Sequence, residues 1–186
     1  LYGLMRDRGY YSGFMVDAIS AVDCALWDIA GKHFGVPVYK LLGGAYRTEI
    51  PAYISGLPVA GLDEKVALAL SWKEKGFKAI KLQIGYGMDE DIRIMRALRE
   101  ALGADFKLMI DAHWNYTVAQ AVKLAHRLEE LDVEFLECPL NPENLAGYSE
   151  LAATVSIPVT LGEADRTHWR YKDILDRNSC DIVQPD

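Results

Sequence analysis

Four acidic residues recur at the ends of four apolar runs in the second half of the chain. They are Asp111, Glu137, Glu163 and Asp186. An interval of 26 residues separates the first from the second and the second from the third, and 23 residues separate the last two. A parallel strand with its crossover helix and loops needs roughly 30 residues. Each carboxylate is therefore expected at the C-terminal end of a parallel strand, where barrels and open α/β enzymes keep their chemistry.

The hydrophobic pattern from residue 50 onward predicts strands that alternate with helices. This alternation is typical of a parallel sheet with right-handed crossovers. Residues 16–33 before it are predicted to form a helix that stops at Gly35, and residues 1–15 are predicted to be loop-like. The predicted strands are 50–55, 78–85, 106–113, 134–140, 158–164 and 181–186, and the predicted helices are 62–76, 89–103, 117–131, 144–155 and 168–178.

The number of predicted strands bears on the fold. A closed βα barrel has eight strands and about 250 residues, whereas this chain has six predicted strands in 186 residues. A curved sheet of six strands would leave two edges unpaired. We therefore expect a partial barrel that belongs to a larger polypeptide. A doubly wound open sheet is the alternative, and it is disfavoured because no glycine-rich phosphate loop follows the first predicted strand.

Composition disfavours several classes of partner. The chain is 51% hydrophobic and 25% charged, which is typical of a soluble globular protein, and its net charge is −7. This charge disfavours nucleic acids and acidic membranes, and no apolar run reaches the ~18 residues of a membrane span. The three isolated cysteines are typical of reduced, mostly buried thiols in a cytosolic protein. They are Cys24, Cys138 and Cys180.

Side chains two residues apart on a strand face the same way. Lys81 and Gln83 should thus share one face of their strand, and Asp111 and His113 should share one face of the next. A single carboxylate at a strand end is more often a helix cap or a surface charge, but three acids in register on consecutive strands favour a site. The predicted ring of polar groups contains Lys81, Gln83, Asp111, His113, Glu137, Glu163 and Asp186.

Acids gathered in this way repel one another unless a cation lies among them. A hard divalent cation such as Mg²⁺ takes oxygen ligands from a few carboxylates and water. Asp111, Glu137 and Glu163 are the predicted ligands. Zinc is disfavoured because the chain has no His/Cys set with ligand spacing, and Mn²⁺ remains open.

The motifs around these residues resemble those of one known group of enzymes. They are AISAVDCALWDIAGK at 18–32, KLQIG at 81–85, IDAHW at 110–114, FLECPL at 135–140, LGEA at 161–164 and DIVQPD at 181–186. The chain resembles the enolase superfamily, and within it the mandelate racemase/muconate lactonizing enzyme-like proteins. The resemblance implies a modified (β/α)7β barrel, a modified TIM barrel, with an α+β capping domain. Residues 1–45 would be the end of that capping domain, and residues 46–186 a partial barrel truncated after the sixth strand.

The resemblance also implies a reaction and its machinery. The shared step is abstraction of the proton next to a carboxylate, and Mg²⁺ and a lysine stabilise the resulting enediolate. Lys81 would lie beside the substrate carboxylate or the negatively charged enediolate. Asp186 would orient a histidine from a following strand that this sequence does not contain. A cytoplasmic homo-oligomer that acts on a small carboxylate substrate is implied as well.

Two departures distinguish functions within the family. Racemases of this group carry K-x-K, whereas Gln83 replaces the second lysine here, and an amide cannot accept the proton of a two-base reaction. His113, in D-x-H, resembles the histidine of sugar-acid dehydratases such as galactonate and mannonate dehydratases, in which it is the general acid for the departing hydroxyl. Arg166 could bind an anionic group of the substrate or form a surface salt bridge.

These features lead to three hypotheses. The first is a Mg²⁺-dependent dehydratase that converts a sugar acid into a 2-keto-3-deoxy acid. The second is a racemase, epimerase or cycloisomerase of the same family. The third is a non-catalytic module or an inactive fragment. A dehydratase forms an α-keto acid, whereas a racemase leaves the mass of its substrate unchanged.

Overall fold

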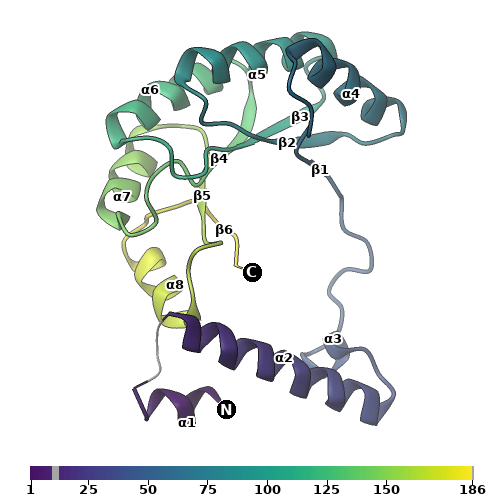
Figure 1. The fold of residues 1–186 in the computed structure, drawn as a ribbon, viewed down its shortest axis with the longest axis vertical. Coiled ribbons are helices and arrows are strands. Elements are labelled where there is room, and N and C mark those ends of the chain that lie inside the picture. Colours follow the sequence, from purple (N-terminus) through teal and green to yellow (C-terminus); the bar gives the residue numbers. More distant parts are fainter. Residues whose placement is uncertain (10–12, 186) are drawn as a thin grey trace. The chain divides into compact units, whose positions relative to one another are not determined.

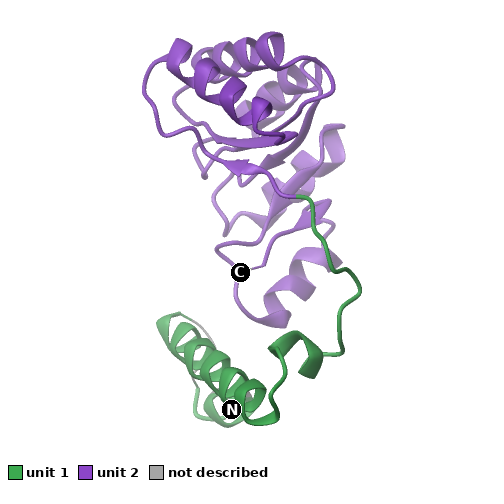
Figure 2. Cartoon of the chain, turned by 90° about the vertical axis from the view of Figure 1, so that its right-hand side faces the viewer, with its two compact units in different colours: residues 1–51 green, residues 52–186 purple. Residues whose placement is uncertain are grey.

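The protein folds into two compact units, residues 1–51 and residues 52–186, which Figure 2 colours separately. The computed structural model describes residues 1–9 and 13–185. Asp186, the predicted partner of a catalytic histidine, lies outside the described residues.

The first unit is helical. It contains α1 (Tyr2–Arg6), α2 (Phe14–Phe34) and α3 (Val38–Leu41). The predicted long helix is confirmed, and Gly35 ends it in the left-handed conformation, with φ of 66° and its N–H bonded to the carbonyls of Gly31 and Lys32. The loop-like prediction for residues 1–15 is wrong over Tyr2–Arg6. That helix has one short turn and no side-chain cap, so it left little signal in the sequence.

The second unit is a six-stranded parallel sheet whose strands follow one another in chain order, β1 to β6 (Figure 1). A doubly wound sheet would reverse its strand order part-way, so that alternative is excluded. The sheet is an open segment of a βα barrel. Its strands are β1 (Ile54–Ser55), β2 (Ala79–Gln83), β3 (Lys107–Asp111), β4 (Val133–Glu137), β5 (Val159–Leu161) and β6 (Ile182–Val183). Its helices are α4 (Leu62–Glu74), α5 (Met88–Leu102), α6 (Val118–Glu129), α7 (Leu145–Thr154) and α8 (Thr167–Asp176).

The hydrophobic core lies between the helices and one face of this sheet. Leu82, Ile110, Leu136 and Val159 project from four successive strands into it, and all four are buried. Side chains alternate between the two faces of a strand. The next residue along each of these four strands therefore belongs to the opposite face. These residues are Gln83, Asp111, Glu137 and Thr160. That face carries polar groups where the strands end.

The strands are shorter than predicted because the chain turns directly after them. β3 ends at Asp111, and His113 and Trp114 have φ of 44° and 62°. β4 ends at Glu137, and Cys138 has φ of 45°. Residues with positive φ cannot continue a strand. The predicted strand ends near 113 and 140 are thus wrong, and alternation along β3 cannot place His113.

A buried carboxylate ties the loops after β2 and β3 together. Asp91, in the first turn of α5, is fully buried and accepts hydrogen bonds from the backbone N–H groups of Gly85 and Tyr86. It also accepts a hydrogen bond from the hydroxyl of Tyr116, which lies in the loop after β3. Burial and this bond raise the pKa of Tyr116 far above its ordinary value. Asp91 thereby fixes two loops beside the strand ends.

No helix in residues 1–9 or 13–185 is long and apolar enough to cross a membrane. Cys138 is buried and Cys180 is partly buried, but Cys24 is exposed. The prediction of mostly buried thiols is therefore wrong for Cys24, which lies on the long helix α2.

Candidate active site

Four side chains lie at one level across four neighbouring strands. Gln83 is paired in register with Asp111, Asp111 with Glu137, and Glu137 with Thr160. The interval between the first two acids thus places them at equivalent strand positions. The second interval, from Glu137 to Glu163, does not lead to an equivalent position, because Thr160 occupies that position on β5 and Glu163 lies two residues beyond the strand.

Glu137 forms a buried ion pair with Lys81. The Nζ of Lys81 donates to both carboxylate oxygens, at 2.8 Å to Oε1 and 2.7 Å to Oε2. The two side chains are 14% and 4% exposed. Burial by itself would lower the pKa of Lys81, but the hydrogen bond and the charge of Glu137 outweigh it and raise this pKa. Lys81 therefore stays protonated at neutral pH.

His113 reaches the acids despite its turn conformation. Its backbone N–H donates to Oδ1 of Asp111 at 2.9 Å, and its Nδ1 lies 3.9 Å from Oε1 of Glu163. Its ring stacks on Trp114 with 4.3 Å between centroids. The backbone N–H of Trp114 donates to the carbonyl of Cys138 at 2.6 Å, so the loops after β3 and β4 are linked.

Negative charge is concentrated at these strand ends. Burial, together with the charges of Asp111 and Glu137, raises the pKa of Glu163 above its ordinary value. Burial and the same three carboxylates raise the pKa of the Cys138 thiol to about 12. A carboxylate that resists ionisation beside two others is a natural partner for a cation.

The three acids suit a hard divalent cation by their chemistry. Carboxylate oxygens are the ligands that Mg²⁺ takes in proteins, and Asp111, Glu137 and Glu163 each supply one carboxylate. Within the described residues, however, no group of three or more His, Cys, Asp or Glu side chains stands in an arrangement that could hold a metal ion. Both oxygens of Glu137 are turned onto Lys81 instead. The three carboxylates are therefore suitable ligands for the ion by their chemistry, but in this structure their oxygens do not converge on one position.

The remaining predicted residues are at the edge of this cluster or outside it. Gln83 is exposed at the end of β2, where it lines a pocket of about 400 Å³ together with Ser55 and Tyr86. Arg166 is exposed directly before α8, and its Nη1 donates to the carbonyl of Ala164 at 2.8 Å. Asp186 is not among the described residues.

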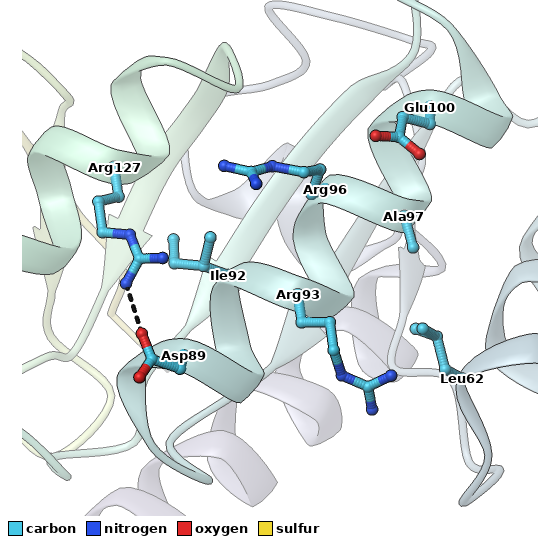
Figure 3. Close-up of a pocket in the computed structure, with 8 residues that line it drawn as sticks. All are labelled: Leu62, Asp89, Ile92, Arg93, Arg96, Ala97, Glu100 and Arg127. Atoms are coloured by element: carbon cyan, nitrogen blue, oxygen red, sulfur yellow. Dashed lines mark hydrogen bonds and ion pairs between the residues drawn. The ribbon is translucent and has the colours of Figure 1, made fainter.

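Another pocket lies on the helical side of the sheet (Figure 3). It has a volume of about 310 Å³ and is lined by residues of α4, α5 and α6, three of them arginines. Arg127 forms an ion pair with Asp89 at 2.9 Å, and Arg93 forms one with Glu90 at 2.7 Å. None of the residues at the strand ends lines this pocket, so the pocket is separate from the candidate site.

Two residues of the cluster were not predicted from the sequence. Thr160 is fully buried and occupies the register position beside Glu137. Gln184 donates from Nε2 to Oε2 of Glu137 at 3.3 Å and accepts a hydrogen bond from the hydroxyl of Thr160. Strand alternation offered a signal for Gln184, because it lies two residues before Asp186 and so shares its predicted face.

Comparison with known proteins settles the family. Residues 64–186 match the family described as "Enolase C-terminal domain-like", and residues 4–43 match "Mandelate racemase / muconate lactonizing enzyme, N-terminal domain". The chain belongs to the enolase superfamily. The resemblance to its mandelate racemase/muconate lactonizing enzyme-like members is thus confirmed.

Curated relatives in this superfamily include both an isomerase and a lyase. The chain is 38% identical over 190 residues to D-galactarolactone cycloisomerase of Agrobacterium fabrum, covering all of this chain and 50% of that protein. It is 39% identical over 181 residues to arabinonate dehydratase of Saccharolobus solfataricus, covering 94% of this chain and 48% of that protein. The chain therefore spans about half the length of these relatives.

Solved structures of the superfamily share the fold. The 3,6-anhydro-D-galactonate cycloisomerase of Zobellia galactanivorans superposes with a TM-score of 0.92 at 38% identity, covering all of this chain and 52% of that one. A Bradyrhizobium enolase complexed with magnesium and mandelic acid superposes with a TM-score of 0.88 at 33% identity, covering 99% of this chain and 51% of that one. The open six-stranded sheet is thus part of a barrel of the superfamily type.

The crowding of acids predicts a stability effect in this enolase-superfamily chain. Because the folded-state pKa of Glu163 is raised, its ionised form destabilises the fold at neutral pH, and this penalty disappears once the pH falls below the ordinary pKa of Glu. Glu163→Gln is therefore expected to raise the melting temperature by on the order of 2 °C at pH 7.5 in EDTA. At pH 4 the difference should vanish.

Thermal denaturation followed by circular dichroism would measure the effect. Glu150→Gln, at an exposed position on α7, is the matched control and should leave the melting temperature unchanged at both pH values. A lower melting temperature for Glu163→Gln in EDTA at pH 7.5 would contradict the repulsion among the three acids.

Proposed function

We propose that the protein removes the proton α to the carboxylate of a sugar acid and eliminates the β-hydroxyl, with Mg²⁺ as cofactor. The product is a 2-keto-3-deoxy acid. The observation that carries the proposal is the placement of a protonated lysine, three carboxylates and a histidine at adjacent strand ends. Relatives that are named as sugar-acid dehydratases support this reaction type.

The acids and the lysine have distinct roles in this proposal. Asp111, Glu137 and Glu163 would hold Mg²⁺, which supplies positive charge beside the substrate carboxylate. Lys81 supplies a second, permanent positive charge from its buried position. Charge placed in advance where the enediolate develops stabilises the transition state more than the ground state.

The other polar residues bind the substrate or move protons. Gln83 donates to and accepts from substrate oxygens but takes no proton. Arg166 binds the distal anionic end of the substrate. His113 would give a proton to the leaving hydroxyl, so the C–O bond breaks and water departs. The base that takes the α-proton would be a histidine oriented by Asp186.

A cycloisomerase is the second candidate, since two cycloisomerases are 38% identical to this chain. A two-base racemase is less well supported, because Gln83 stands where the second lysine of such enzymes is found. A non-catalytic module would show no turnover at all. We also assign residues 1–45 to the end of a capping domain, which the match of residues 4–43 supports.

A substrate screen tests the proposal. Full-length protein is incubated with Mg²⁺ and a library of aldonic and aldaric acids, and α-keto acid is measured as its semicarbazone. Turnover of one acid that stops in EDTA and returns with added Mg²⁺ is the expected result. A product with the mass of its substrate would favour the cycloisomerase instead, and no reaction with any acid would favour the non-catalytic module.

A further inference from the structure

The carboxylate of Glu137 is held from two sides. Lys81 on β2 donates to both of its oxygens, and Gln184, directly after β6, donates from Nε2 to Oε2 at 3.3 Å. Gln184 in turn accepts, at its Oε1, a hydrogen bond from the hydroxyl of Thr160 on β5. A relay thus runs from Thr160 through Gln184 to Glu137 and joins β5, the chain after β6, and β4.

Hydrogen-bond chemistry allows one orientation of the Gln184 amide in this relay. A carboxylate can only accept, so the NH₂ end of the amide must face Glu137. The carbonyl end then faces Thr160, which has a hydroxyl proton to donate. Thr160 is fully buried, so its hydroxyl is held away from bulk water. Valine at this position would leave the amide carbonyl without its partner.

The backbone holds Gln184 in place as well. Its N–H donates to the carbonyl of Leu161 at 3.0 Å. Its main chain also packs closely on Gly162, where an added Cβ would lie 2.7 Å from the carbonyl oxygen of Gln184. A side chain in place of Gly162 would push this segment away. The amide of Gln184 is therefore fixed by its own backbone and by Thr160 together.

The relay makes the two oxygens of Glu137 unequal. Oε2 accepts from both Lys81 and Gln184, whereas Oε1 accepts, among the residues that the structure describes, from Lys81 alone. We propose that Gln184, oriented by Thr160, is a positioning residue that aims the Glu137 carboxylate for cation binding; this rests on the proposed function. Residues that orient a metal ligand typically change metal affinity by 10–100-fold when they are replaced.

Isothermal titration calorimetry of full-length protein with MgCl₂ tests the relay without any substrate. Thr160→Val and Gln184→Met are expected to weaken Mg²⁺ binding by about tenfold. Thr160→Ser keeps the hydroxyl and should bind nearly as the unsubstituted protein does. Thr154→Val is the matched control, because its hydroxyl bonds only to the carbonyl of Glu150 on α7 in the described structure. Melting curves in EDTA show whether each variant is folded.

The outcomes separate the relay from the proposed function. If the unsubstituted protein binds Mg²⁺ and Glu137→Gln does not, but Thr160→Val and Gln184→Met bind normally, the relay is wrong and the proposed function stands. If the unsubstituted protein does not bind Mg²⁺, the proposed function fails and the relay fails with it. If Thr160→Val does not fold, the Mg²⁺ affinity of Gln184→Met tests the proposal instead, because the unbranched and flexible side chain of Met adapts to the site.

Discussion

Replacement of Lys81 by methionine is expected to lower kcat by about 10²–10³-fold, the loss typical when one preorganised donor to a developing negative charge is removed. Methionine keeps much of the length and bulk of the lysine stem but carries no charge. The protonated amine of Lys81 lies within 2.7–2.8 Å of Glu137, and both side chains are largely buried. Steady-state kinetics on the acid identified by the substrate screen would measure the change.

The effect on turnover must be distinguished from an effect on folding. Lys81→Met leaves Glu137 buried without its cation, which is costly for stability. Lys81→Arg retains the charge, so we expect it to stay folded while turnover still falls, since the planar guanidinium cannot reproduce the contacts of an ammonium. Lys107→Met, at an exposed pair with Glu134 on the same sheet, is the matched control and should turn over normally. A folded Lys81→Met protein with more than about a tenth of the original kcat would remove Lys81 from the mechanism.

The order of helices and strands was predictable from the sequence. α5 shows why, since acids begin it, apolar residues recur along one face, and Gly103 ends it. Strand ends were not predictable in the same way. His113 and Cys138 follow β3 and β4 with positive φ, a conformation that non-glycine residues adopt only where the surrounding structure supports it. The residue types at positions 113 and 138 therefore did not predict where these two strands end.

The candidate site was predictable in its strand positions but not in its contacts. Equal spacing placed Asp111 and Glu137 at equivalent positions, because one strand-and-helix unit separates them. It could not show that Lys81, 56 residues earlier, turns onto Glu137. The Lys81–Glu137 ion pair depends on burial, because two opposite charges that are buried as a pair are far more favourable than the same charges buried separately. The buried Asp91 was missed for a similar reason, since its partners are backbone N–H groups that any sequence possesses.

Replacement of His113 by asparagine is expected to lower α-keto acid formation by about 10²–10⁴-fold, the usual contribution of a general acid. Asparagine suits the position because it tolerates positive φ better than most residues, and His113 has φ of 44°. The variant therefore keeps the turn, the backbone bond to Asp111 and the pair of Lys81 with Glu137. What it loses is the proton for the leaving hydroxyl.

A dehydratase that lacks this acid should still abstract the α-proton, so His113→Asn is expected to take up deuterium at the α-carbon when it is incubated with substrate in D₂O. His126→Asn, on α6 beside Glu129, is the matched control and should form keto acid at the original rate. Nuclear magnetic resonance of the recovered acid would follow both outcomes in one sample. If His113→Asn forms keto acid as fast as the original protein, His113 is not the acid. If the original protein exchanges the α-proton but forms no keto acid from any sugar acid, elimination is excluded and an isomerase accounts for the same lysine and carboxylates.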